Sequence, residues 1–188
     1  MILFCTPTGQ EQRWINDFDN IKKVVIGIGT DNLLSGIEYQ IKNTPGLQFV
    51  LLFGSAGLTN WKLSHRALYM PEKYWYLLDY KWHRVTNLLM ARFKPYVKTL
   101  SEGVTNSYQS THQKKMRIQY ENFNIIDMES AFVIRTCNQY QIPIIVIRYV
   151  SDRCDKKLMP VGINHFHRKW HAKRMQSKMN AILRALNC

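Results

Sequence analysis

The stretch NFNIIDMESAFVIRTCNQYQIPIIVIRYVSDRCD, residues 122–155, decides how the rest of the chain is interpreted. It holds two short apolar runs, NII and IPIIVIRYV, and each ends at acidic residues: Asp127 and Glu129 follow the first run, and Asp152 follows the second. Continuous apolar runs of this kind are typical of buried strands in a parallel sheet. Ligands bind beyond the carboxyl ends of such strands, so we expect the three acids to share a polar site.

Each acid also has a purely structural interpretation. An acid at 127 or 129 lies in the first turn of a predicted helix, where a negative charge contributes about 0.3–1 kcal/mol. Ser151 and Asp152 are good N-cap residues. These two strand ends, together with a third predicted strand that ends in GSAG at residues 54–57, favour convergence on a common site over unrelated structural roles.

The rest of the chain shows the same alternation of apolar runs and amphipathic segments. We predict helices over LLSGIEYQIKNTPG, over MESAFVIRTCNQYQ and over a basic stretch at about 165–186, and strands over MILFCTP, KKVVIGIGTDN, LQFVLLFGSAG, VKTLSEGVT, NIID and IPIIVIRYV. Residues 58–100 mix short strand-like and helical patterns. The prediction is one α/β domain over residues 1–188, with a largely parallel or mixed central sheet flanked by helices.

Composition bounds the class of protein. The 188 residues are 46% hydrophobic and carry 26 Lys and Arg against 13 Asp and Glu, a net charge of +13. That excess is compatible with a nucleic-acid or anionic-membrane contact, or with a basic surface that has no specific partner. The four cysteines lie far apart without a C-x-x-C pair, which fits a reducing compartment. With neither a signal-peptide pattern nor a long apolar run, we expect a cytoplasmic protein.

A second feature is FGSAG, residues 53–57, at the end of a predicted strand. Glycine and other small residues let the backbone approach a ligand closely, although a plain tight turn has the same composition. The GIG at residues 27–29 is not a G-x-G-x-x-G dinucleotide fingerprint.

IIDMESAFVIRTCNQYQIPIIVIRYVSD, preceded by GIG and LLFGSAG in that order, resembles the nucleoside phosphorylase superfamily. Within it, the pattern is most similar to the methylthioadenosine/S-adenosylhomocysteine nucleosidases, which carry a strand ending in G-S-A-G, a Met-Glu helix start and a strand ending in R-x-x-S-D. The resemblance runs loosely from Met1 to about Asp155, and beyond that it extends only to a terminal helix. It implies a nucleoside phosphorylase-like fold.

The resemblance also implies catalytic roles. Asp152 would protonate N7 of the purine, and Ser151 would orient its carboxyl group. Arg148 would help to hold the nucleophilic water, and Glu11, just after the first strand, would be the general base. These roles suit a reaction through an oxocarbenium-like sugar, which needs one acid for the departing base and one carboxylate to activate water. An acid at the end of a buried strand can have its pKa raised by desolvation, as a proton donor requires.

Substrate-binding roles follow from the same resemblance. Glu129 would bind ribose hydroxyls and Met128 would pack on the sugar. The remaining predicted contacts would line the site beside the base and the ribose: Ser55, Ala56, Gly57 and Tyr108, the last either stacked on the purine or simply packed. The implied activity is hydrolysis of the N-ribosidic bond of methylthioadenosine- or adenosylhomocysteine-type nucleosides, without metal or organic cofactor, by a homodimer.

The chain departs from the family pattern at three places. The segment between GSAG and DMES is shorter than usual, and GSAGL has one glycine fewer. Gly9 and Arg13 have the spacing of a phosphorylase phosphate contact, with Glu11 between them. Phosphorylases add an arginine before the strand-end glycine, where this chain has Leu52 and Phe53, so we favour water over phosphate as the nucleophile. Phosphorolysis, and nucleoside binding without turnover, are the alternatives.

The C-terminal tract NHFHRKWHAKRMQSK has three interpretations. His165, His167 and His171 suggest a metal site, but the tract has no acid or cysteine to complete it. A basic helix also fits contact with nucleic acid or an anionic surface. The interpretation we favour is a solvated terminal helix that packs an apolar face on the sheet, through Ile163, Trp170, Ile182, Leu183 and Leu186.

Overall fold

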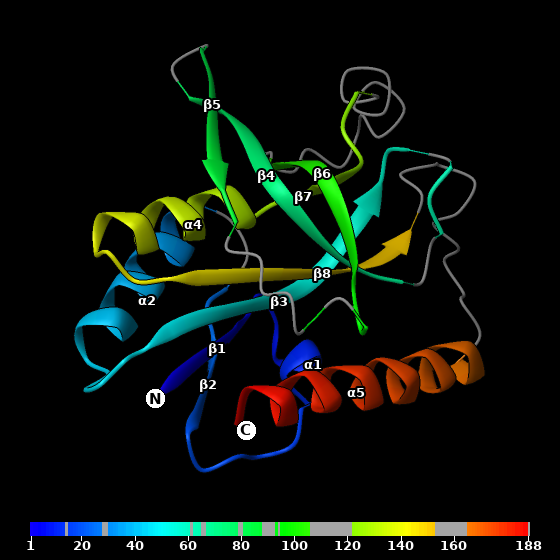
Figure 1. Cartoon of the computed structure of the whole chain (residues 1–188), viewed down its shortest axis with the longest axis horizontal. Coiled ribbons are helices and arrows are strands. Elements are labelled where there is room, and N and C mark those ends of the chain that lie inside the picture. The colour runs from blue at the N-terminus through cyan, green and yellow to red at the C-terminus, as the bar shows by residue number, and fades with distance from the viewer. Residues whose placement is uncertain are drawn as a thin grey trace.

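The structure is a computed structural model of the whole chain (Figure 1). It describes residues 1–13, 15–27, 30–60, 62–64, 67–78, 81–87, 93, 95–105, 122–152 and 165–187. At residues 10, 30–33, 77–78, 82, 151–152, 165–172 and 187 it describes the backbone alone. None of the described helices combines the length and the apolar character that a membrane span requires.

Strands and helices alternate up to residue 58 and again from residue 125, as the sequence predicts, whereas the strands between residues 49 and 127 follow one another without an α-helix among the described residues. The strands are β1 (Ile2–Thr6), β2 (Ile21–Val25), β3 (Phe49–Leu58), β4 (Leu68–Leu78), β5 (Lys81–Thr86), β6 (Lys98–Thr105), β7 (Ile125–Asp127) and β8 (Ile144–Asp152). The helices are α1 (Gly9–Gln12), α2 (Thr30–Lys42), α4 (Ser130–Gln139) and α5 (His165–Asn187). The predicted α/β class, with a mixed sheet flanked by helices, is confirmed.

The strands form one eight-stranded sheet in the order β2-β1-β3-β7-β6-β4-β5, with β8 paired to both β3 and β4. Pairings β1–β2, β1–β3, β3–β8, β4–β6 and β6–β7 are parallel, and pairings β3–β7, β4–β5 and β4–β8 are antiparallel. The β4–β5 hairpin is the part of the segment at 58–100 that sequence patterns left without an assignment.

Alternate residues of the central strands face two separate layers of helix, as a period of two requires. On β1, Ile2 and Phe4 belong to a core cluster with the apolar face of α5, whereas Leu3 and Cys5 belong to a cluster with α2 and α4. β3 and β8 divide in the same way. Figure 1 accordingly shows α2 and α4 on one side of the sheet and α5 on the other. Because both faces are covered, these strands have the continuous apolar composition seen in the sequence.

Five of the strands close into a ring, because β3 pairs with β7, β7 with β6, β6 with β4, β4 with β8 and β8 with β3. All five contribute to one buried apolar cluster, which consists of Ala56, Leu58, Tyr69, Leu100, Ile125 and Val150. A closed ring directs one face of every strand toward a common interior. The side chains next to this cluster on β3, β7 and β8 form the site described below.

Asn87, just after β5, completes the contact between β4 and β8. Its Nδ2 donates to the carbonyl oxygens of Pro71 (2.8 Å) and Val146 (3.0 Å), and its Oδ1 accepts from the Val146 N–H (2.8 Å). Pro71 has no N–H to offer to a neighbouring strand. The buried amide therefore takes the place of strand–strand hydrogen bonds two residues from Arg148.

We expect Asn87→Ala to lower the free energy of unfolding by about 3 kcal/mol, because it leaves buried backbone groups on two strands without a partner. Urea unfolding of the purified variant measures this. Asn43→Ala is the control: that side chain donates a single exposed hydrogen bond to Tyr39, and we expect a change within about 0.5 kcal/mol. Equal effects for the two variants would show that Asn87 does not secure the β4–β8 contact.

Candidate active site

The site is built around Arg148 on β8, which is fully buried. Strand register places Arg148 opposite Gly54 of β3, and a Cβ atom added at Gly54 would lie 2.3 Å from Arg148 Nη1. Only glycine leaves room for the guanidinium here, so the first glycine of FGSAG has a packing function. The period of two also puts Arg148 on the same face of β8 as Val150, next to the apolar interior of the ring.

Asp127, the last residue of β7, is the main counter-ion of Arg148. Its Oδ2 lies 3.0 Å from Arg148 Nε and accepts from Ser130 Oγ at 2.5 Å. Its Oδ1 accepts from the backbone N–H groups of Glu129 (3.1 Å) and Ser130 (2.9 Å) and from Thr105 Oγ1 (2.8 Å). The sequence suggested that Asp127 shapes the helix start. The structure shows that the same carboxylate binds the first N–H groups of α4 and the buried guanidinium.

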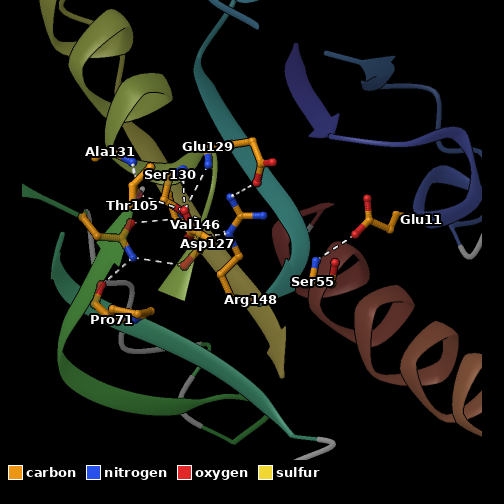
Figure 2. A network of polar contacts seen from close by, with 11 residues as sticks. Glu11, Ser55, Pro71, Thr105, Asp127, Glu129, Ser130, Ala131, Val146 and Arg148 are labelled. Atoms are coloured by element: carbon orange, nitrogen blue, oxygen red, sulfur yellow. Dashed lines mark hydrogen bonds and ion pairs between the residues drawn. The ribbon is translucent and has the colours of Figure 1, made fainter. Parts of the chain in front are cut away.

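Glu129 is the N-cap residue of α4 and the second partner of Arg148. The distance between Arg148 Nη2 and Glu129 Oε2 is 3.1 Å (Figure 2). Its side chain is almost completely buried. Burial raises the pKa of Glu129 from its ordinary value of 4.5 to about 7. The Arg148 charge opposes this rise, and the charges of Asp127 and Glu11 add to it. Glu129 therefore exchanges its proton close to neutral pH.

Arg148 keeps its charge in this environment. Burial acts to lower its pKa, but the acids Asp127, Glu129 and Glu11 and the phenol of Tyr74 outweigh it and raise the pKa above the ordinary value. Nη1 is buried and has no hydrogen-bond partner among the described residues. Figure 2 shows this nitrogen on the side of the guanidinium that faces Glu11 and Ser55. A charged donor held in this way is suited to bind an oxygen atom of a ligand or of water.

Glu11 lies on α1, close to the end of β3, and is also buried. Its Oε1 accepts from the Ser55 N–H at 2.8 Å, and its Oε2 accepts from the Thr8 N–H (3.1 Å) and from Thr8 Oγ1 (2.9 Å). Thr8 and Glu11 form a capping box, in which each side chain binds the backbone N–H of the other residue. This reciprocal arrangement fixes the carboxylate at the start of a very short helix and ties the β1–α1 turn to β3.

The structure therefore brings four of the predicted site residues together: Glu11, Ser55, Glu129 and Arg148. Of the other predicted contacts on described elements, Met128 is half-buried beside Glu129, Ala56 points into the ring interior, and Gly57 pairs with β7 and β8.

The remaining predicted residues are placed in part or not at all. Ser151 and Asp152 end β8, and the Asp152 backbone pairs with Gly57 after a register irregularity, but their side chains are outside the described set. Tyr108 lies outside the described residues. Gly9 and Arg13 are exposed at the two ends of α1.

Two residues of the network were missed by the sequence analysis. Thr105 Oγ1 donates to Asp127 and accepts from the Ala131 N–H at 2.9 Å, and Ser130 Oγ accepts from Arg148 Nε at 2.9 Å. Thr105 is a polar residue that ends a strand, which is the same signal that identified the acids. Within the part of the chain that is described, no group of three or more His, Cys, Asp or Glu side chains is placed to hold a metal ion.

Known proteins resemble this chain in sequence and in fold. The family model described as the phosphorylase superfamily matches residues 51–186. A curated 5'-methylthioadenosine/S-adenosylhomocysteine nucleosidase of Bacillus cereus is 40% identical over 42 residues, which are 22% of this chain. The match spans only 18% of that relative's length.

Solved structures match over nearly the whole chain. The 5'-methylthioadenosine/S-adenosylhomocysteine nucleosidase of S. pneumoniae, solved with a transition-state inhibitor, has a TM-score of 0.77 at 15% identity. The match covers 98% of this chain and 99% of the nucleosidase chain. The Campylobacter jejuni nucleosidase has a TM-score of 0.74 at 15% identity and covers 97% of both chains. The Helicobacter pylori futalosine hydrolase has a TM-score of 0.71 at 14% identity, with 98% and 97% covered. At these identities, the similarity establishes a shared fold.

The raised pKa of Glu129 predicts a pH-dependent stability. Because the folded state holds this proton more tightly than the unfolded chain, the contribution of Glu129 to stability is highest below about pH 4.5 and falls as the pH rises through about 7. Glutamine does not titrate, so the Glu129→Gln variant lacks this pH-dependent contribution to stability. Urea unfolding across that range should show the stability of the wild type falling relative to the variant by up to about 3 kcal/mol.

Glu38→Gln is the control for this titration, because hydrogen bonds from Lys42 and Tyr140 lower the pKa of the exposed Glu38. Its difference from the wild type should stay nearly constant between about pH 4.5 and 7, and the contribution of Glu38 to stability should be lost only as the pH falls below about 4.5. A Glu129→Gln difference that stays constant with pH would contradict the proton exchange near neutral pH.

Proposed function

This chain belongs to the phosphorylase superfamily, and from that premise we propose that it hydrolyses the N-ribosidic bond of purine nucleosides of the methylthioadenosine or adenosylhomocysteine type. One observation carries the proposal: the buried Arg148 binds Asp127 and Glu129 through Nε and Nη2, and its Nη1, which has no hydrogen-bond partner among the described residues, lies on the side facing Glu11. Such an arrangement provides a held cation, a fixed carboxylate and an acid within one site.

Proton donation to the base is the proposed role of Asp152. Protonation at N7 of the purine makes the base a better leaving group, so that the N-ribosidic bond breaks as positive charge develops on the sugar. The pairing of the Asp152 backbone with Gly57 supports this role, because Gly57 ends the G-S-A-G sequence. Ser151 would orient the carboxyl group.

Water activation is the proposed role of Glu11, with Arg148 Nη1 positioning the water oxygen. Glu11 is already fixed by hydrogen bonds to Ser55 and Thr8, so little reorganisation is needed when a water enters between the two groups. The proton removed from water passes to Glu11, and the hydroxide oxygen bonds to the anomeric carbon. All these groups belong to the chain, so the mechanism needs no metal or organic cofactor.

Ribose binding is the proposed role of Glu129, with Met128 packed on the sugar. A carboxylate accepts hydrogen bonds from two vicinal hydroxyls, but a protonated carboxyl group does so less well. With a pKa of about 7, Glu129 would bind ribose better as the pH rises toward neutral. Ser55, Ala56, Gly57 and Tyr108 would complete the surroundings of the base and the sugar.

The choice of nucleophile rests on the turn between β1 and α1. The Ser55 and Thr8 N–H groups, which are the kind of donors an anion needs, are occupied by the carboxylate of Glu11. A phosphate at this place would meet a negative charge, whereas a water would meet a base. Arg13 is exposed at the C-terminal end of α1, two residues after Glu11. Phosphorolysis is the second candidate because Gly9 and Arg13 keep the phosphorylase spacing.

The exact substrate and the assembly are also proposals. Similar folds belong to proteins named as methylthioadenosine/adenosylhomocysteine nucleosidases and as a futalosine hydrolase, so futalosine joins the candidate substrates. We propose a cytoplasmic homodimer, on the resemblance to the nucleosidase family.

The first experiment is release of free base from methylthioadenosine, adenosylhomocysteine, futalosine, adenosine and inosine, with and without phosphate. We expect release from at least one of the first three without phosphate. Asp152→Asn should reduce turnover by about 10²–10⁴-fold while leaving the unfolding transition in place, because the proton donor is lost. If Asp152→Asn retains nearly full activity, Asp152 is not the acid. A wild-type protein that binds these nucleosides without releasing base would be a binding-only relative.

Glu11→Gln tests the nucleophile. Glutamine keeps an acceptor for the Ser55 N–H but cannot take a proton from water, so hydrolysis should fall by about 10²-fold or more. Glu38→Gln, an exposed carboxylate change on α2, should leave turnover unchanged. Base release that requires phosphate and is lost in Arg13→Ala would instead identify a phosphorylase.

A further inference from the structure

Helix α5 carries no acidic residue over its 23 residues. Its Lys and Arg positions run along its length: Arg168, Lys169, Lys173, Arg174, Lys178 and Arg184. A helix that only needed to be solvated would be expected to mix both signs of charge, because oppositely charged pairs four residues apart stabilise it. The presence of positive charge alone on α5 therefore points to a function at its surface.

The apolar face of α5 is already in use. Met175, Met179, Ile182 and Leu183 are fully buried in the core cluster that includes β1, β3 and β8. The opposite side carries Lys173, Arg174 and Arg184 in exposed positions. Because a helix that lies in a membrane surface needs its apolar face free for the lipid, α5 is poorly suited to insert into a bilayer.

A cation from the sheet joins this charged side. Lys98 begins β6, directly after Val97, which packs in the same core cluster as Met175 of α5. Lys178 is partly buried, and its pKa is lowered by that burial and by the charges of Arg174 and Lys98. Arg174 and Lys178 are four residues apart on α5 and so lie on the same side of the helix, and the charge of Lys98 acts on Lys178 from β6. Bringing like charges together costs free energy, and a bound anion recovers it.

We propose that Lys98, Lys173, Arg174 and Lys178, here called the α5 cationic face, bind the phosphate backbone of a nucleic acid. Arg174 and Lys178 are separated by about 6 Å along the helix, a spacing suited to successive charges on an extended polyanion. Neutralisation of phosphates by Lys and Arg with release of counterions drives binding without regard to sequence. The net charge of +13 adds long-range attraction, and burial of Asp127, Glu129 and Glu11 removes three acids from the surface that would offset it.

The test is fluorescence anisotropy of a labelled single-stranded RNA oligonucleotide, and of a duplex DNA, titrated with the full-length protein at several salt concentrations. We expect binding at low salt, and we expect the logarithm of the association constant to fall linearly with the logarithm of the salt concentration. The double variant Arg174→Glu/Lys178→Glu should weaken binding by about tenfold or more and reduce the salt slope by about 2. Lys98→Glu should weaken it by about threefold or more, although it lies on a different element.

The matched control is Lys81→Glu, an exposed lysine on β5, which Figure 1 shows on the far side of the molecule from α5. It changes the net charge as much as Lys98→Glu does. Equal losses for these two single variants would show that net charge, and not the α5 cationic face, drives binding. Thermal unfolding of each variant, and the milder Arg174→Gln/Lys178→Gln pair, separate a binding effect from loss of fold.

Two further outcomes would overturn the proposal. Absence of oligonucleotide binding by the wild-type protein at low salt would do so directly. Binding to vesicles containing phosphatidylserine, lost in the Arg174→Glu/Lys178→Glu variant and without any oligonucleotide binding, would assign the α5 cationic face to a membrane surface instead.

Discussion

The positions of three elements depend on one buried charge, the guanidinium of Arg148. An ion in the protein interior is tolerated only when opposite charges and hydrogen bonds replace its water. Here Asp127 at the end of β7, Glu129 at the start of α4 and Ser130 one residue later supply them. Removing any one partner leaves charge uncompensated, so β7, α4 and β8 cannot shift independently. Within the described residues, the same constraint leaves Nη1 without a hydrogen-bond partner, so it can donate to a ligand.

The closed ring of strands is what brings those elements to one place. Because each strand of the ring directs one face inward, polar residues at the ends of different strands lie close together in space. Thr105, Asp127 and Arg148 come from three strands of the ring, β6, β7 and β8, and meet although β8 pairs with neither of the other two. Gly54 adds the necessary space on β3. The Asn87 amide holds β8 to β4 where Pro71 cannot contribute an N–H.

The central strands and the shared position of Asp127 and Glu129 were predictable because their physical signals are local. Apolar runs identified β1, β3 and β8, and acids directly after such runs marked the site. The β4–β5 hairpin was not predictable, since LYMPEKYWYLL contains Pro71 and two charged residues within a strand that is paired on both sides. The hydrogen bonds of Asn87 and the packing of Arg148 on Gly54 depend on residues far apart in the chain. The side chain of Asp152 and the whole of Tyr108 remain predictions of the sequence.

Closure of the ring has a consequence for how the protein avoids self-association through its backbone. Strands within a ring have both neighbours in place, whereas β2 and β5 each have a single neighbouring strand among the described elements. β2 carries Lys22 and Lys23, and β5 carries Lys81 and Arg84. Charged side chains on an edge oppose the addition of a strand from another molecule, because pairing would bring like charges together or strip their water. Some of the residues that make the chain basic thus also oppose aggregation through β2 and β5.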